Sequence, residues 1–214
     1  MSDYRTFLAQ KHKSAAKTGF KVSQSGLNPM LKHFQRDIVL WACERGRAAI
    51  FAGCGLGKTI MQLNWSQLAC EHTGGNAIVL TPLAVAKQTK REGDKFGIPV
   101  TICASQADVR PGINVTNYHK LHHFDCRAFD VVVLDEAQIL KNFSGATKRK
   151  LCDEFSHTPY RLACTATPAP NDHLELGNHS QFLGIMESPE MIARWFINDA
   201  MEAGNYRLKR HAEQ

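Results

Sequence analysis

Short apolar runs rich in β-forming residues alternate with helical segments along most of this 214-residue chain. The clearest run, Val131–Leu134, contains no polar residue, which is typical of a parallel strand covered on both faces. This alternation predicts an α/β fold: a mainly parallel sheet with right-handed crossovers and helices on both sides, in three α/β/α layers. We expect strands within residues 47–53, 76–82, 100–105, 113–118, 129–138 and 161–167. We expect helices within residues 28–46, 58–72, 83–96, 144–155, 172–183 and 190–201.

Polar residues follow several of these strands at the point where each strand ends. In open parallel sheets, ligands bind at the carboxyl ends of the strands. Lys58, Thr81, Asp135 and Thr165 each lie at or just past the end of an apolar run. The pattern therefore predicts a functional site along one edge of the sheet.

The segment between the first strand and the following helix has the spacing of a phosphate-binding loop. It matches the pattern G-x-x-x-x-G-K-[ST] in a relaxed form that begins with Ala52. Backbone N–H groups at the start of a helix face an anion together, so such a loop favours phosphate. We expect Lys58 to reach the terminal phosphates of ATP and the Thr59 hydroxyl to bind Mg²⁺. The candidate nucleotide-binding residues of the loop are Gly53, Cys54, Gly55, Leu56, Gly57, Lys58 and Thr59.

A pair of carboxylates, Asp135 and Glu136, ends the strand that contains Val131–Leu134. In nucleotide hydrolases, such a pair binds Mg²⁺ through the first carboxylate and activates the attacking water through the second. We therefore expect Asp135 to bind the metal and Glu136 to act as the general base. Lys58 and Gln138 complete the predicted catalytic set.

The net charge of +6 is concentrated at the N-terminus. Residues 1–36 hold seven Lys and Arg residues against one acidic residue, whereas the remainder of the chain is balanced. Two interpretations stay open: a solvated extension, or an arm that binds a polyanion by releasing counterions. The seven cysteines are scattered and include no C-x-x-C pair, which favours reduced thiols and a cytoplasmic location. No apolar run approaches the length of a membrane span, so we expect no membrane partner.

Further motifs extend the match to a known family. Asp135–Gln138 (D-E-A-Q) resembles the DEAD/DEAH box of superfamily 2 helicases and translocases, and Thr165–Pro168 (T-A-T-P) resembles their motif III. The phosphate loop, residues 78–92 and residues 115–121 are similar to motifs I, Ia and Ib. Lys141 and Asn142 after the box are typical of the Swi/Snf-like branch, in its phage or bacterial type.

The resemblance implies a RecA-like P-loop NTPase lobe over residues 27–185, between a basic arm (1–26) and a helical extension (186–214). It also implies that Gln35 reads adenine. Thr165, Ala166 and Thr167 would couple the nucleotide state to movement. One nucleic-acid strand, DNA in preference to RNA, would contact Thr81, Pro82, Lys87, Thr116, Asn117 and Tyr118.

Members of this superfamily use two RecA-like lobes, and the second supplies an arginine finger. No Gly-Arg motif follows Thr167, so we expect a second lobe to be supplied in cis by a longer parent or in trans. The expected function is the motor lobe of a nucleic-acid-dependent ATPase that uses ATP and Mg²⁺. The alternative is a non-catalytic module that binds nucleic acid in response to ATP. A small-molecule kinase would explain Lys58 but not the T-A-T-P segment. We expect Trp41, Trp65 and Trp195 to lie in the core.

Overall fold

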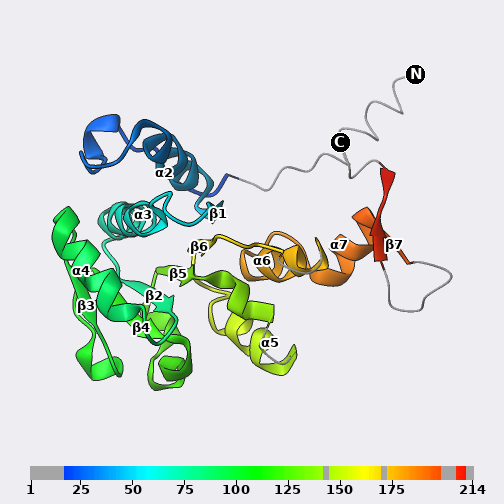
Figure 1. The fold of residues 1–214 in the computed structure, drawn as a ribbon. Coiled ribbons are helices and arrows are strands. Elements are labelled where there is room, and N and C mark those ends of the chain that lie inside the picture. Colours follow the sequence, from blue (N-terminus) through cyan, green and yellow to red (C-terminus); the bar gives the residue numbers. More distant parts are fainter. Residues whose placement is uncertain (1–16, 142–144, 170–172, 199–205, 211–214) are drawn as a thin grey trace.

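The computed structural model describes residues 17–141, 145–169, 173–198 and 206–210 (Figure 1). Six strands form one sheet in the order β1-β6-β5-β2-β4-β3, and every pairing in it is parallel. The predicted parallel α/β sheet is thereby confirmed. Its strands are β1 (Arg47–Phe51), β2 (Ala77–Thr81), β3 (Val100–Ile102), β4 (Ile113–Asn117), β5 (Val131–Asp135) and β6 (Tyr160–Thr165).

Helices connect the strands in the expected alternation. The α-helices are α2 (His33–Arg45), α3 (Lys58–Thr73), α4 (Ala86–Phe96), α5 (Gly145–Glu154), α6 (Leu176–Phe182) and α7 (Ser188–Trp195). Short 3-10 helices are η1 (Gln24–Gly26), η2 (Gln106–Asp108), η3 (Tyr118–His123), η4 (Cys126–Ala128), η5 (Ala137–Lys141) and η6 (His173–Glu175). Gly46, Gly74 and Gly97 end α2, α3 and α4 with positive φ, a conformation that glycine adopts readily at helix ends. Within the described ranges, no helix combines the length and apolarity that a bilayer crossing requires.

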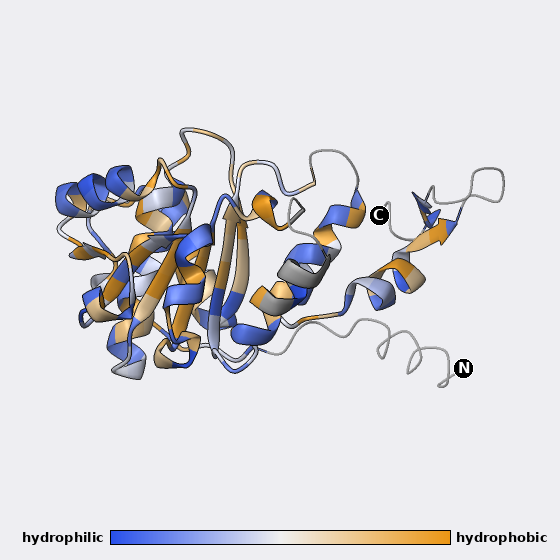
Figure 2. Cartoon of the chain, turned by 90° about the horizontal axis from the view of Figure 1, so that it is seen from below, coloured by the Kyte–Doolittle hydropathy of each residue, from blue (hydrophilic) through white to orange (hydrophobic). Residues whose placement is uncertain are grey.

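Two apolar clusters cover the two faces of the sheet. Val131 and Val133 point toward α2 and α3, and Val132 and Leu134 point toward α5 and α6. Figure 2 shows the resulting layers, with hydrophobic strands in the centre and more polar helices outside. Because β5 is buried on both faces, its sequence shows a continuous apolar run instead of an alternating pattern.

Residues 17–26, which the sequence predicts to belong to the basic arm, pack on the lobe. The backbone N–H of Phe20 donates to the carbonyl of Cys43 at 2.9 Å. The Phe20 ring stacks on His72 with centroids 4.2 Å apart and meets the edge of Tyr160 at 5.5 Å. This segment therefore closes the N-terminal end of β6, opposite the edge where the predicted site residues lie.

The C-terminal extension differs from its prediction. The helix expected over residues 190–201 ends at Trp195, because Phe196 is extended and β7 (Phe196–Asn198) pairs antiparallel with β8 (Tyr206–Leu208). Pro189 lies in the first turn of α7. Backbone N–H groups in a first turn have no partner within the helix, so the N–H that proline lacks costs no hydrogen bond there.

The predicted burial of the tryptophans is confirmed for one of the three. Trp65 is fully buried, but Trp41 is 44% exposed and Trp195 is partly exposed. Helix α2 buries Val39, Ala42 and Cys43 instead, and Trp41 lies under the guanidinium of Arg45. The prediction for Trp41 was wrong because only one face of α2 is covered.

Replacement of Phe20 by Ala tests whether this segment belongs to the lobe. We expect Phe20→Ala to lower the free energy of unfolding by about 2 kcal/mol, because it removes a stacked, partly buried ring. Urea unfolding measures the change. Leu83→Ala, at a side chain that is 73% exposed, is the matched control and should change it little. Equal effects of the two substitutions would contradict the packing of residues 17–26 on the lobe.

Candidate active site

The register of β1, β6 and β5 brings the motif-bearing strand ends together. Phe51 pairs with Thr165, and Asp135 pairs with Cys164 on the other side of β6. The N–H of Ala52, the first residue after β1, donates to the carbonyl of Thr165 at 3.2 Å. The phosphate loop, the carboxylate pair and the T-A-T-P segment therefore emerge side by side.

The loop between β1 and α3 depends on glycine at two positions. Gly55 and Gly57 have φ of 78° and 81°, which glycine adopts without steric cost. A Cβ on Gly57 would also lie 2.4 Å from the Gln35 amide nitrogen. The Nζ of Lys58, the first residue of α3, donates to the Ala52 carbonyl at 3.1 Å. The loop thus curls around the start of a helix, and Gly53, Cys54, Gly55 and Leu56 are exposed.

Gln35, which the sequence predicts to read adenine, touches this loop. Its Nε2 donates to the Leu56 carbonyl at 2.9 Å, and its Oε1 accepts the backbone N–H of Lys32 at 2.8 Å. A glutamine amide has two N–H groups and two lone pairs, so one of each remains after these bonds. Gln35 is only 5% exposed, which fixes its amide at the rim of the loop.

Asp135 is a buried carboxylate in an environment that disfavours its charge. Burial, and next the negative charge of Glu136, raise its pKa to about 6. The Gln62 amide and the positive charge of Lys58 act in the opposite direction. Gln62 is itself fully buried, and neither of its polar atoms has a hydrogen-bond partner within 3.5 Å. Gln62 thus faces Asp135 without making a normal hydrogen bond to it.

Glu136 has an unusual backbone conformation. Its φ is 52°, and within the described ranges no other non-glycine residue has a positive φ. Such a conformation is sparsely populated for a side chain of this size and is frequent at functional sites. The surrounding fold therefore holds the backbone of Glu136 in a conformation that a non-glycine residue does not prefer.

Thr165 and Thr167 bond directly to the D-E-A-Q segment. The Thr165 hydroxyl donates to Gln138 Oε1 at 3.2 Å, and the Thr167 hydroxyl donates to the same oxygen. The backbone N–H of Thr167 donates to the Thr165 hydroxyl at 3.1 Å. The side-chain amide oxygen of Gln138 therefore joins the D-E-A-Q segment to the T-A-T-P segment. Ala166 lies between the two threonines that contact this oxygen.

The six residues predicted to contact nucleic acid do not share one exposed surface. Thr81, Thr116, Asn117 and Tyr118 are at most 7% exposed, because they lie at or directly after the ends of β2 and β4. Pro82 is partly exposed and Lys87 is exposed. Among these six residues, solvent therefore reaches mainly Pro82, in the loop before α4, and Lys87, at the start of α4.

Two residues at this edge were not predicted from the sequence. Gln62 lies one helical turn after Lys58, on the same side of α3. The feature that could have revealed it is a polar residue within a buried stretch of the helix. His179 of α6 is 4% exposed, contacts the Pro168 carbonyl at 3.0 Å and meets the Phe51 ring edge at 5.3 Å. Burial lowers the pKa of His179, which favours a neutral ring.

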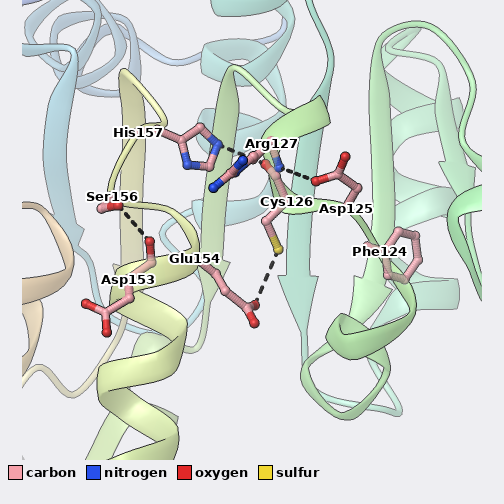
Figure 3. A pocket seen from close by; sticks show the side chains of 8 residues that line it. All are labelled: Phe124, Asp125, Cys126, Arg127, Asp153, Glu154, Ser156 and His157. Carbon is pink, nitrogen blue, oxygen red and sulfur yellow. Dashed lines mark hydrogen bonds between the residues drawn. The ribbon is translucent and has the colours of Figure 1, made fainter.

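A cavity of about 660 Å³ lies away from this edge (Figure 3). It is lined by η4 and by residues at and after the end of α5, next to the N-terminal ends of β5 and β6. Inside it, the Cys126 thiol faces Glu154 at 3.5 Å and His157 contacts the Cys126 carbonyl at 3.2 Å (Figure 3). None of the predicted site residues lines this cavity.

The donor groups present at the loop edge fit Mg²⁺ and a triphosphate. A Cβ on Gly57 would collide with the Gln35 side chain, so this position requires glycine. The backbone N–H groups of such a loop, at the start of a helix, are the groups that bind phosphate. Lys58 lies near enough to Asp135 for its positive charge to lower the pKa of that carboxylate. A divalent cation would offset the unfavourable charge of the buried Asp135, and oxygen ligands suit Mg²⁺.

A model of the SNF2-related domain matches residues 34–212 of this chain. The chain belongs to the SNF2-related domain family. The helicase SWR1 of Debaryomyces hansenii is 30% identical over 219 residues, which cover 89% of this chain and 13% of that protein. The helicase SWR1 of Kluyveromyces lactis is 28% identical over 149 residues, or 60% of this chain and 9% of that protein. The chain therefore spans a small fraction of these relatives.

Solved structures share the fold of this SNF2-related domain. The SWI2/SNF2 ATPase core of Sulfolobus solfataricus, in complex with double-stranded DNA, matches with a TM-score of 0.64 and 21% identity. That match covers 82% of this chain and 41% of the other. The UvsW helicase of bacteriophage T4 matches with a TM-score of 0.60 and 12% identity, over 86% of this chain and 66% of the other. The family match confirms the predicted Swi/Snf-like resemblance, and these structures confirm the predicted fold.

The raised pKa of Asp135 makes stability depend on pH. The folded chain holds a proton on Asp135 up to about pH 6, whereas the unfolded chain loses it near 3.8, so ionisation destabilises the fold as pH rises between these values. Without Mg²⁺ and nucleotide, we expect Asp135→Asn to raise the free energy of unfolding at pH 8 by up to about 3 kcal/mol. At pH 4 it should change little.

Urea unfolding at both pH values measures this difference. Asp37→Asn, at an exposed carboxylate of α2, is the control and should change the free energy of unfolding little. An equal effect of Asp135→Asn at pH 4 and pH 8 would show that the carboxylate is not destabilised by its surroundings.

Proposed function

We propose that this chain is the ATP-binding motor lobe of a nucleic-acid-dependent ATPase, a DNA translocase or helicase. Membership of the SNF2-related family supports the motor class. The observation that supports the finer assignment most directly is the joint emergence of the phosphate loop, Asp135-Glu136 and T-A-T-P at one sheet edge. A loop for phosphate beside a carboxylate pair is the donor set that ATP hydrolysis requires.

Each polar residue at this edge has a distinct proposed role. Lys58 exchanges its bond to the Ala52 carbonyl for the terminal phosphates, and the loop N–H groups bind the others. Thr59 and Asp135 hold Mg²⁺, which supplies positive charge near the phosphates when bound. Glu136 orients the attacking water and accepts its proton. Gln35 uses its remaining N–H and lone pair to read adenine.

Thr165, Thr167 and Gln138 couple the nucleotide to movement in this proposal. Their shared oxygen links the T-A-T-P segment to the residues that follow the carboxylate pair. A change in position of Glu136 would therefore reach β6 through two hydroxyl groups. This is the kind of two-state contact that transmits a bound state across a fold.

Duplex DNA is the proposed track, contacted through the segment that begins with Pro82 and includes Lys87. Support comes from the exposure of this segment and from the similar Sulfolobus solfataricus core, which was solved with double-stranded DNA. Lysine binds phosphate without regard to sequence. The other four predicted residues would contact DNA only after a rearrangement, since their side chains are buried.

Full activity in this proposal needs a second RecA-like lobe, in cis or in trans, that supplies an arginine finger. Such a finger changes the hydrolysis rate by about 10³ to 10⁵. The division into a basic arm, a lobe and a C-terminal extension, and a cytoplasmic location (that of the host for a virus), belong to the same proposal. The seven cysteines, all within the described ranges, form no disulfide with one another, which supports a reducing compartment. A non-catalytic ATP-responsive binding module is the competing function.

ATP turnover by the chain decides between these two functions. We expect weak hydrolysis that duplex DNA stimulates more than single-stranded DNA or RNA. Lys58→Ala should abolish nucleotide binding, because it removes the cation at the terminal phosphates. Glu136→Gln should retain binding and lower the hydrolysis rate by about 10² to 10⁴. Tight DNA binding that responds to neither ATP nor Glu136→Gln would favour the non-catalytic module instead.

Substitution of Lys87 tests the proposed DNA surface. Lys87→Ala should weaken duplex binding about equally for all sequences and reduce the slope of log K against log [salt] by about 1. Lys95→Ala, in the last turn of the same helix, is the matched control and should leave the slope unchanged. Titrations at several salt concentrations give both slopes. Identical slopes for the two variants would show that Lys87 does not contact DNA, and that the DNA surface lies elsewhere on the lobe.

A further inference from the structure

A buried tyrosine hydroxyl binds the carbonyl that precedes Glu136. Tyr118 Oη donates to the Asp135 carbonyl oxygen at 2.8 Å. Tyr118 opens η3 directly after β4, whereas Asp135 ends β5, and β2 lies between these two strands in the sheet. The tyrosine side chain therefore ties together the ends of two strands that are not neighbours.

This hydrogen bond acts on the peptide group whose orientation sets the backbone of Glu136. The Asp135 carbonyl belongs to the same rigid peptide plane as the Glu136 N–H. Glu136 has φ of 52°, in the left-handed region that costs a non-glycine residue roughly 1 kcal/mol or more. A fixed donor on that carbonyl stabilises the peptide orientation that this φ requires.

Burial of Tyr118 keeps its ring away from the surface of the lobe. Its side chain is 6% exposed, so its ring does not form part of a surface that nucleic acid could reach. The same burial raises the pKa of the phenol well above its usual value, so the hydroxyl stays protonated and able to donate. Tyr118 packs with Leu134 and Leu80 in the apolar cluster on the α5 side of the sheet.

We propose that Tyr118 is a positioning residue for hydrolysis, which holds Glu136 in its working orientation through the Asp135 carbonyl. The inference rests on the proposed function, in which Glu136 activates the attacking water. Tyr118 touches neither nucleotide nor DNA in this role. Loss of its hydroxyl leaves a buried carbonyl without this donor and lets the peptide before Glu136 rotate.

Tyr118→Phe removes the hydroxyl and keeps the ring. With duplex DNA present, we expect kcat for ATP to fall by about ten- to a hundredfold, because a small displacement of a catalytic group has effects of this size. KM for ATP and the affinity for duplex DNA should stay unchanged. Tyr160→Phe, at a tyrosine 8% exposed near the opposite edge of the sheet, is the matched control. It should leave kcat unchanged.

A double variant tests whether Tyr118 acts through Glu136. If it does, Tyr118→Phe combined with Glu136→Gln should hydrolyse ATP no more slowly than Glu136→Gln alone. If the losses in hydrolysis rate of the two single variants multiply in the double variant, the proposal is overturned, because Tyr118 would then act independently of Glu136. A fall in DNA affinity with unchanged kcat would also overturn it, in favour of a nucleic-acid contact.

Hydrogen exchange separates this proposal from the proposed function. In Tyr118→Phe, the amides of Glu136 and Ala137 should exchange faster than in the parent chain and in Tyr160→Phe. If the parent chain neither binds nor hydrolyses ATP, the proposed function fails, and exchange alone decides the role of Tyr118. Unchanged exchange at these amides would mean that the hydroxyl does not hold the peptide, whatever the activity.

Discussion

β6 pairs in parallel with β1 on one side and with β5 on the other, so the three strands end at the same edge of the sheet. Because β6 lies between them, its last residue, Thr165, is next to both the phosphate loop and the carboxylate pair. The bond from the Ala52 N–H to the Thr165 carbonyl fixes the beginning of the loop. Each contact described at the site depends on this shared edge. Helices α3 and α6 add Lys58 and His179 from opposite faces of the sheet.

Several energetically unfavourable features meet at this edge. A carboxylate is buried at Asp135, the next residue has a left-handed backbone, and the nearby Gln62 amide lacks a hydrogen-bond partner. A fold that served only stability would have little reason to hold all three together. The surrounding apolar strands supply the stability that makes them tolerable. Their coincidence beside a glycine-dependent loop is the structural mark of a site built for charged ligands.

Much of this architecture follows from the sequence alone. The strands could be predicted because buried parallel strands are continuous apolar runs, and the helix ends because Gly46, Gly74 and Gly97 stop them. The phosphate loop and Asp135-Glu136 were recognisable because their chemistry is local in sequence. The sequence did not reveal the hydrogen bond of Tyr118, because its partner is a carbonyl two strands away and no spacing rule reports such a contact. Trp41 was misassigned because helical periodicity does not say which faces of a helix have neighbours.

The pairing of β1 has a consequence for how the chain reaches its fold. Among the strands that the structure describes, β1 is an edge strand and pairs only with β6, although Arg47 and its partner Arg161 stand far apart in the chain. Closing so long a loop before any pairing energy is gained is slow, as in other folds rich in non-local contacts. During synthesis, residues 47–59 would leave the ribosome long before the strand that anchors them. We therefore expect the phosphate loop, although its residues are contiguous and early, to be among the last parts of the lobe to become ordered.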